Sequence, residues 1–311
     1  MKVTIFTPTY NRASYLNQIF DALCRQTDKR FEWLIIDDGS TDNTAECVEA
    51  FRNQIIDFNI RYFYQNHSGK PSAQNKAIEL AEGELFITCD SNKFPADDTV
   101  ELIIKTSETI NNNPYFCGIG GYRANKDGYI WGGPINFNGN DYIDCTRLEH
   151  EKYNISGDKS TAFYTDILKK YKSPEFPNED FVSEIVWLYP MAVDGYKTRW
   201  LPKIFIYGEY APGGLTMTGA NSRLGHEKNF MGFCEEIKVI KTAKGLKFAE
   251  YLLYEAMDIA KYKNISDRKL AKKTGSSLAI ISYLRLIRTF HKIYGIISSC
   301  IKKNNRYQNN K

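Results

Sequence analysis

Short runs of apolar, β-branched and aromatic residues alternate with longer amphipathic runs over the first 125 residues of the chain. The short runs predict strands, and they cover residues 3–7, 31–37, 61–64 and 85–89. Apolar residues recur at helical spacing in residues 15–26, 44–53, 72–81 and 97–110. This alternation predicts an α/β fold, in which a mostly parallel sheet is flanked by helices on both faces.

Polar residues gather where three of these predicted strands end, in TPTYNR (7–12), DDGSTDNT (37–44) and DSNK (90–93). A fourth polar stretch, NHSGKPSAQN (66–75), opens the third predicted helix. Each stretch alone would fit a capped turn, because Asp, Ser, Asn and Gly favour turns and helix N-termini. Ligands of parallel sheets bind beyond the carboxyl ends of the strands. The four stretches together therefore predict a binding crevice.

The rest of the chain divides into a glycine- and aromatic-rich middle and a helical end. Residues 115–220 predict extra strands and loops that close over the crevice, and a helix over residues 180–189. From residue 243 onward the spacing of apolar residues predicts helices. With 311 residues, 42% of them hydrophobic, the chain is long enough for one large domain with additions or for two domains.

Positive charge is concentrated at the end of the chain. Residues 265–311 contain eleven Lys or Arg and one acid, about +10, so the net charge of +4 leaves 4 − 10 = −6 for the remainder. Residues 276–303 predict a basic amphipathic helix, with Arg285, Arg288 and Lys292 on one face. Two interpretations stay open: attachment to a membrane surface, or docking on the preceding domain with a solvated basic side. The charges come without a nucleic-acid-binding motif, which argues against nucleic acid as partner.

Cysteine spacing and hydropathy bear on the compartment. The seven cysteines are widely spaced and form no CxxC pair, which favours a reducing compartment. The opening MKVTIFTPTYNR lacks the apolar region of a signal peptide, and no run approaches the roughly 20 apolar residues of a membrane span. We expect a cytoplasmic protein, either soluble or peripheral at the inner face of the plasma membrane.

Six motifs in a fixed order resemble family 2 glycosyltransferases of the GT-A fold, of the bacterial surface-polysaccharide type. They are FTPTYNRASYL, FEWLIIDDGSTDNT, NHSGKPSAQNKAIELAEGELFITCDS, GDK (157–159), EDFVSE (179–184) and EYAPGGLT (209–216). The resemblance implies a Rossmann-like GT-A domain over residues 1–225, with a nucleotide-sugar-binding half (1–113) and an acceptor half (114–225). Residues 226–311 would form a helical, basic C-terminal extension.

The resemblance also implies a set of residues that contact the nucleotide-sugar. They are Thr7, Pro8, Tyr10, Arg12, Asp37, Asp38, Lys70, Asn75, Asp90 and Ser91. Within this set, Asp38 would accept from a uracil N–H and Asp37 would reach ribose. Thr7, Pro8 and Tyr10 would line the base, and Lys70 would meet phosphate at the start of a helix.

The stretch Asp90-Ser91-Asn92-Lys93 departs from the D-S-D-D that the family usually has, whose later aspartate binds Mn²⁺ or Mg²⁺. The amide oxygen of Asn92 is an acceptable ligand for a hard cation but carries no charge, and Lys93 opposes a cation nearby. Three outcomes stay open: a weaker Mn²⁺ or Mg²⁺ site on Asp90 and Asn92, metal-free catalysis in which Lys93 stabilises the diphosphate, or lost activity.

The family carries its catalytic acidic residue in the EDFVSE segment. If residues 180–187 are helical, Asp180 and Glu184 lie on one face. We expect Glu184 to be the catalytic base, with Asp180 as the alternative.

The expected function is that of an inverting glycosyltransferase. It would move a sugar from a nucleotide-sugar, a UDP-sugar foremost, to a glycan or lipid-linked acceptor in cell-surface polysaccharide biosynthesis. The alternative is a non-catalytic nucleotide- or glycan-binding relative that has lost the full metal site.

Overall fold

The computed structural model describes residues 2–289 apart from residues 55, 111–112, 210–218 and 220–221. The chain divides into two compact units, Met1–Gly232 and Phe233–Lys311, so the division falls later than the boundary expected after residue 225. Nearly all of the EYAPGGLT motif and the part of the basic tail after residue 289 lie outside the described residues.

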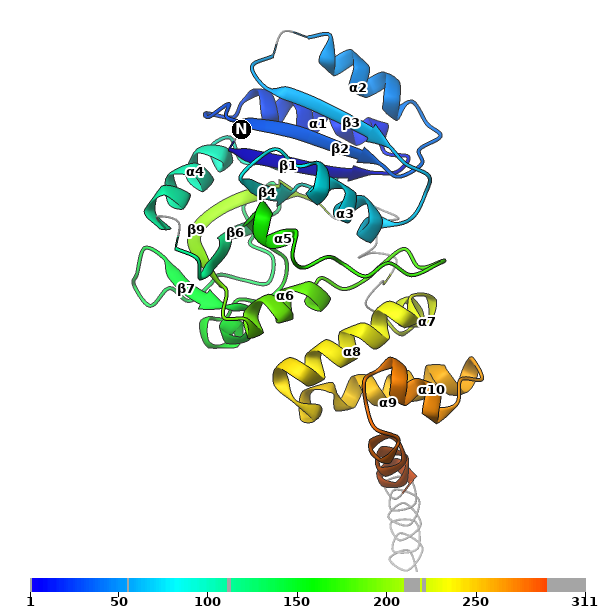
Figure 1. The fold of residues 1–311 in the computed structure, drawn as a ribbon. Coiled ribbons are helices and arrows are strands. Elements are labelled where there is room, and N and C mark those ends of the chain that lie inside the picture. Colours follow the sequence, from blue (N-terminus) through cyan, green and yellow to red (C-terminus); the bar gives the residue numbers. More distant parts are fainter. Residues whose placement is uncertain (1, 55, 111–112, 210–218, 220–221, 290–311) are drawn as a thin grey trace, which may run out of the picture. The chain divides into compact units, whose positions relative to one another are not determined.

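The first unit is built on a mixed sheet (Figure 1). Its strands among the described residues are β1 Val3–Thr9, β2 Phe31–Asp37, β3 Asn59–Tyr64, β4 Leu85–Thr88, β5 Lys93–Pro95, β6 Phe116–Ala124, β7 Ile143–Thr146, β8 Lys159–Tyr164 and β9 Lys197–Gly208. They lie in the order β3-β2-β1-β4-β8-β6-β9-β5, with β7 paired to β9. The strands predicted from the first 90 residues, β1 to β4, pair in parallel, whereas β8 is antiparallel to both β4 and β6. The α/β class and the GT-A type of sheet are thus confirmed.

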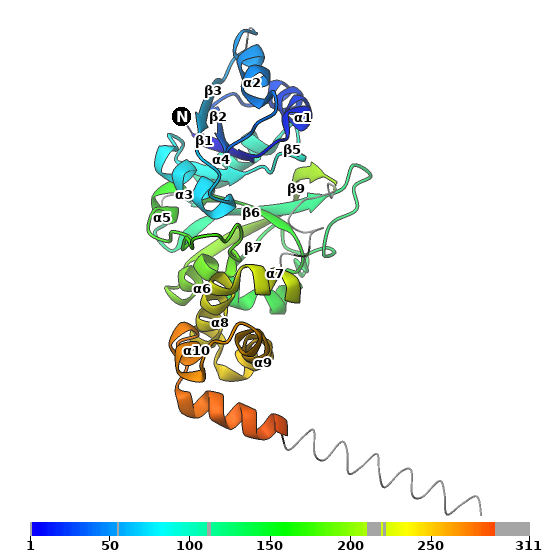
Figure 2. The same ribbon diagram turned by 90° about the vertical axis from the view of Figure 1, so that its right-hand side faces the viewer.

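Helices cover both faces of this sheet, as the two views show (Figures 1 and 2). In the first unit they are α1 Ala13–Cys24, α2 Thr44–Arg52, α3 Lys70–Leu80, α4 Thr99–Ile110, α5 Thr165–Leu168, the 3₁₀ helix η1 Arg147–Tyr153, α6 Ile185–Val193 and α7 Arg223–Lys228. The helices α1 to α4 were predicted from apolar spacing, with ends that differ by a few residues.

Two core layers follow from the alternation of side chains along the strands. On β2, Trp33 and Ile35 pack with apolar residues of α1, α2 and α4. Their neighbours Leu34 and Ile36 point to the opposite face and pack with residues of α3, α5 and α6. Because β2 is buried on both faces, it appears in the sequence as an almost continuous apolar run.

One charged side chain interrupts that run. Glu32 of β2 is fully buried, and its carboxylate accepts from Thr4 Oγ1 at 2.6 Å and from the Glu82 amide at 2.7 Å. The Arg61 Nη1 of neighbouring β3 lies 2.9 Å from Glu32 Oε2. The buried negative charge is therefore matched by one cation and by two further donors.

The carboxyl ends of β1, β2 and β3 meet at the same edge of the sheet. Thr9 lies opposite Asp37 in the register of β1 and β2, and Asp37 lies opposite Tyr64 in that of β2 and β3. On the other side of β1, Phe6 pairs with Thr88 at the end of β4. The segments that follow these strands are therefore neighbours in space, as the polar clusters predict.

The second unit is helical. It contains most of α8 Phe230–Lys244, together with α9 Leu246–Tyr262, α10 Asp267–Lys273 and a helical stretch over residues 278–289. Two arginines of that stretch form paired contacts inside the unit, Arg285 Nε with Asp267 Oδ2 at 2.8 Å and Arg288 Nη1 with Asp258 Oδ1 at 2.7 Å. This part of the predicted basic face is matched by acids of the same unit. In the part of the chain that the structure describes, none of the helices combines the length and the apolar character that crossing a membrane requires.

Candidate active site

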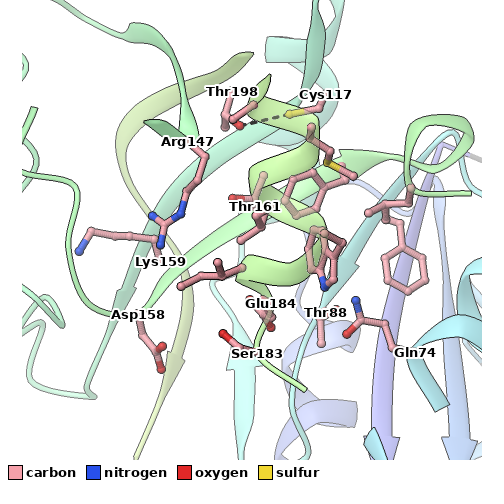
Figure 3. Close-up of a pocket in the computed structure, with 18 of the residues that line it drawn as sticks. Gln74, Thr88, Cys117, Arg147, Asp158, Lys159, Thr161, Ser183, Glu184 and Thr198 are labelled. Carbon is pink, nitrogen blue, oxygen red and sulfur yellow. Dashed lines mark hydrogen bonds between the residues drawn. The ribbon is translucent and has the colours of Figure 1, made fainter. Parts of the chain in front are cut away.

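A cavity of about 320 Å³ opens beside the end of β4, and its walls carry both acids and bases (Figure 3). Its charged and ionisable lining residues are Lys70, Asp90, Lys93, Arg123, Arg147, His150, Asp158, Lys159 and Glu184. Phe163, Trp187, Met191 and Trp200 supply much of the apolar wall. The cavity therefore combines a charged part near Asp90 with an apolar part under α6.

Three cationic side chains surround the carboxylate of Asp90. Lys70 Nζ lies 2.8 Å from Oδ1, while Lys93 Nζ and Arg123 Nη1 lie 3.0 and 3.6 Å from Oδ2. Burial by itself would raise the pKa of Asp90, but these three cations outweigh it and hold the pKa well below its ordinary value. Asp90 is thus a carboxylate at neutral pH.

The donor set around Asp90 does not fit a divalent cation. Both carboxylate oxygens already face ammonium or guanidinium groups, and each like charge about 4 Å away opposes a cation by about 4 kcal/mol per unit charge at an effective dielectric constant of 20. The Asn92 amide donates from Nδ2 to the backbone oxygen of Glu209 at 2.5 Å. Among the described residues, no group of three or more His, Cys, Asp or Glu could hold a metal ion.

Glu184 lies at the start of α6 and faces into the cavity, next to Ser183 (Figure 3). It is near enough to Lys70 and Arg123 to favour their charged forms, so it shares the electrostatic field of the Asp90 cluster. Arg147 of η1 lines the same cavity, and desolvation lowers the pKa of its guanidinium. The structure thus places one carboxylate of the EDFVSE segment in the cavity.

The predicted helix over residues 180–189 is wrong in its first half. Helix α6 begins at Ile185, so Asp180 and Glu184 do not share a helix face. The reason is a set of contacts distant in sequence: Asn229 Oδ1 accepts from the amides of Asp180 and Phe181 at 3.0 and 3.2 Å. Those two amides hydrogen-bond away from their own segment.

Glu179 is occupied in the same way. Its carboxylate accepts from the amides of Met231 and Gly232, at 2.8 and 2.9 Å, in the first turn of α8. A carboxylate at a helix N-terminus satisfies amides that have no partner within the helix and faces the positive end of the helix dipole. Glu179 therefore anchors the EDFVSE segment to residues 229–232.

We expect Glu179→Ala to loosen this anchor. Two buried or half-buried donors would lose a charged acceptor, which costs about 1–3 kcal/mol locally. Hydrogen exchange at the amides of Met231 and Gly232 should accelerate about tenfold or more. Asp166→Ala, which removes an acid whose side chain is 93% exposed, is the matched control and should leave these amides unchanged. Unchanged exchange in Glu179→Ala would contradict the assignment.

The two aspartates of DDGS organise the crevice loops. Asp37 accepts from the Tyr62 hydroxyl at 2.6 Å and from the Ser40 amide at 2.8 Å. Asp38 accepts from the amides of Ser68 and Gly69 at 3.0 and 2.9 Å. Because Gly69 caps α3 with a φ of +87°, Asp38 fixes the turn that presents Lys70 at the start of that helix.

Tyr10 and His67 form a stacked pair above this turn, with ring centroids 4.4 Å apart. His67 Nδ1 lies 2.8 Å from Asp38 Oδ2, and its Nε2 lies 4.0 Å from Asp180 Oδ1. Asp180 is also ion-paired with Lys228. Asp180 thus lies beside the Tyr10–His67 pair and already has a cationic partner.

Several residues of the predicted nucleotide set make contacts within the protein. Thr7 is fully buried and accepts from Trp33 Nε1 at 3.0 Å, so its side chain faces the core. Asn75 donates to the Ser173 carbonyl at 2.8 Å and accepts from the Ser173 amide at 3.0 Å, which ties α3 to that loop. Arg12 lies over the Tyr15 ring at 5.4 Å. Pro8 lies in β1 and Ser91 is buried beside Asp90.

The sequence interpretation missed Arg123, Arg147 and His67 as members of the site. Arg123 lies in β6 and Arg147 in η1, and only the pairing of β8 between β4 and β6 brings Arg123 to Asp90. His67 stands in the polar stretch 66–75, which was a usable signal, because the whole stretch was predicted to border the crevice.

The family model for "Glycosyl transferase family 2" matches residues 4–172, more than half of the chain. The chain therefore belongs to glycosyl transferase family 2. This confirms the resemblance seen in its motifs.

Curated relatives agree with that membership. An uncharacterized glycosyltransferase of Rickettsia felis is 34% identical over 127 residues, which are 41% of this chain and 20% of that protein. The poly(ribitol-phosphate) beta-N-acetylglucosaminyltransferase TarS of Staphylococcus aureus is 31% identical over 103 residues, 32% of this chain and 18% of that protein. The chain thus matches about a fifth of the length of these relatives.

Two solved structures share the fold. S. aureus TarS 1-349 in complex with UDP-GlcNAc superposes with a TM-score of 0.60 at 21% identity and covers 84% of this chain and 73% of that one. The mannosyltransferase PcManGT from Pyrobaculum calidifontis, in complex with GDP-Man and Mn²⁺, superposes with a TM-score of 0.54 at 19% identity. The superposition covers 93% of this chain and 83% of that one.

Proposed function

We propose that the chain is an inverting glycosyltransferase that transfers a sugar from a nucleotide-sugar, a UDP-sugar foremost, to a hydroxyl of a glycan or lipid-linked acceptor. The observation that carries the proposal is the juxtaposition in one cavity of Glu184 with the cations around Asp90. A base for the acceptor hydroxyl and cations for the leaving diphosphate, together in one cavity, are what a displacement at a sugar carbon requires.

In this proposal Glu184 removes the proton of the acceptor hydroxyl as its oxygen attacks the anomeric carbon. The bond from that carbon to the diphosphate oxygen breaks, its electron pair leaves with the nucleoside diphosphate, and the configuration at carbon inverts. Asp180 is the less favoured base, because its carboxylate is ion-paired with Lys228.

The nucleotide would lie along the edge formed by the ends of β1 and β2. Tyr10 is 46% exposed and offers a ring for the base, while Asp37 and Asp38 hold the surrounding loops. UDP is favoured as the nucleotide because TarS, which shares the fold, was solved with UDP-GlcNAc. The apolar wall of Phe163 and Trp187 would take the transferred sugar or its acceptor.

We assign this chemistry to residues 1–225 and propose that residues 226–311 serve as an extension. Of the basic face, Arg285 and Arg288 have acidic partners, so a membrane contact would depend on the remaining basic residues of the tail. Deleting residues 290–311 should reduce partition onto anionic vesicles if the tail binds a surface, and unchanged partition would remove that role.

The test of the function is turnover of a donor panel. UDP-, GDP- and dTDP-sugars are incubated with the chain, and released nucleoside diphosphate is measured with and without candidate saccharide acceptors. We expect release from one nucleotide class, at a rate that an acceptor increases. Binding without release would favour the non-catalytic relative, and absence of both would refute the enzyme.

A further inference from the structure

We propose that Lys70, Lys93 and Arg123 together bind the diphosphate of the donor, in place of a divalent cation, and that Asp90 is the positioning residue that holds these three cations in place. The proposal rests on the glycosyltransferase function proposed above. It assigns Asp90 a different role from that of a metal ligand, and it adds Arg123 to the site.

The three cations come from three separate elements and converge on one carboxylate. Lys70 opens α3, Lys93 opens β5 and Arg123 lies near the end of β6. Their nitrogens approach both oxygens of Asp90, at 2.8, 3.0 and 3.6 Å. Three cations around one carboxylate are more than a single ion pair needs.

Two of these cations are largely buried, so their positive charge has to be compensated. The side chains of Lys93 and Arg123 are only 8% and 14% exposed, and Lys93 Nζ also lies over the Trp131 ring at 5.2 Å. Buried charges require compensation by charges of opposite sign. Asp90 supplies one negative charge, and Asp158, 3.9 Å from Arg123, supplies a second. Glu184 is a third acid near these cations. Over the whole lining of the cavity, Lys70, Lys93, Arg123, Arg147 and Lys159 face Asp90, Asp158 and Glu184, so the charge is 5 − 3 = +2 and the cavity is cationic, which suits a diphosphate.

The position of the cluster matches that ligand. Lys70 follows Gly69 at the start of α3, where the positive end of the helix dipole also favours phosphate. Gly69 is held by Asp38 of the loop proposed to border the nucleotide. Glu184, the proposed base, lines the same cavity as these cations and is near enough to Lys70 and Arg123 to favour their charged forms. A diphosphate on the cluster would therefore place the sugar between the cations and Glu184.

Asp90 has a defined task in this arrangement. Without it, three like charges would lie around one point with no anion between them and would repel one another. Asp90→Asn should therefore weaken diphosphate binding to the same extent with metal and with chelator. The loss of a metal ligand would instead weaken binding only when metal is present.

The first experiment is calorimetric binding of UDP, with GDP and dTDP in parallel, to the full chain in excess EDTA and in Mn²⁺. We expect the dissociation constant of the wild-type chain for its preferred nucleotide to differ less than threefold between the two conditions. Lys93→Gln and Arg123→Gln should each weaken diphosphate binding about 10- to 100-fold in both conditions. Their binding of the plain nucleoside, uridine or guanosine, should stay unchanged, which shows that they fold. Lys93→Arg should retain most of the affinity.

Lys76→Gln is the matched control, because it removes a lysine from the same helix as Lys70 whose ammonium donates to the Tyr64 carbonyl rather than to Asp90. Its diphosphate affinity should equal that of the wild-type chain.

A charge reversal provides a second, independent test. In the double variant Asn92→Asp/Lys93→Asp, two added carboxylates replace a neutral and a cationic neighbour of Asp90. We expect this variant to bind Mn²⁺ in electron paramagnetic resonance titrations and to bind UDP at least tenfold more tightly with Mn²⁺ than with EDTA. The wild-type chain should leave the signal of free Mn²⁺ unchanged at equimolar concentration.

The outcomes separate this inference from the proposed function. If EDTA weakens UDP or GDP binding of the wild-type chain more than tenfold, the cation cluster is refuted and the glycosyltransferase function stands. If UDP, GDP and dTDP all fail to bind in either condition, both proposals fail. Equal binding in both conditions, lost in the Lys93 and Arg123 variants, supports the cation cluster, and turnover of the donor panel then decides between the enzyme and the non-catalytic relative.

Discussion

Glu184→Gln should lower kcat for sugar transfer about 10²- to 10⁴-fold, the range that a general base contributes to such reactions. The amide keeps the shape of the side chain but cannot remove the acceptor proton. Since Glu184 is proposed to act on the acceptor hydroxyl and is not one of the three cations proposed to bind the diphosphate, we expect donor affinity to change little. Steady-state kinetics combined with UDP binding measure the two quantities separately.

Two neighbouring variants make this result specific. Ser183→Ala removes a polar side chain that lines the same cavity and should reduce kcat less than tenfold. Asp180→Asn should also act mildly, because Asp180 is ion-paired with Lys228 and lies near His67. If Asp180→Asn abolishes transfer while Glu184→Gln does not, Asp180 is the base and the proposed assignment of Glu184 is wrong.

Arg61→Met should destabilise the first unit by about 3–5 kcal/mol, the cost of leaving a buried charge without its partner. Glu32 is fully buried, and Arg61 is its only cationic partner among the described residues. Urea unfolding followed by tryptophan fluorescence measures the effect. All four tryptophans, at positions 33, 131, 187 and 200, lie in the first unit, so this signal reports on that unit.

The control for Arg61→Met is Lys2→Met. Lys2 pairs with Glu84 at the surface, with side chains 44% and 62% exposed, and surface pairs of this kind contribute about 0–1 kcal/mol. The double variant Arg61→Met/Glu32→Gln should recover part of the lost stability, because the unpaired charge is removed. Equal destabilisation by Lys2→Met and Arg61→Met would show that the buried pair contributes no more to the free energy of unfolding than the surface pair does.

The crevice could be predicted from sequence because it follows from local patterns. Alternating strands and helices imply a parallel sheet, and the polar residues after β1, β2 and β4 must then lie at one edge. The structure shows this arrangement: Asp38 contacts Ser68 and Gly69, and Lys70 contacts Asp90. The family membership that the motifs indicated is likewise confirmed.

The parts of the site and fold that the sequence did not predict depend on contacts between residues that are distant in the sequence. Arg123 reaches Asp90 because β8 inserts antiparallel between β4 and β6, and no local pattern in GIGGYR indicates that order. The helix predicted over residues 180–189 starts late because residues 179–181 hydrogen-bond to a distant segment. The Asp180 amide donates to Asn229, and the Glu179 carboxylate accepts from the first turn of α8. Glu32 is a single charged residue in an apolar strand, and nothing in the sequence around it indicates that Arg61 on β3 is its partner.

The anchor between Glu179 and the start of α8 has a consequence for dissecting this protein into parts. A chain ended at residue 225, at the edge of the recognisable motifs, would lack Asn229, Met231 and Gly232. Glu179 would then have lost both amides that it accepts from, and the segment that carries Glu184 would be free at one end. The shortest fragment that keeps this segment in place must therefore extend through Gly232, into a helix that the sequence alone assigns to the extension.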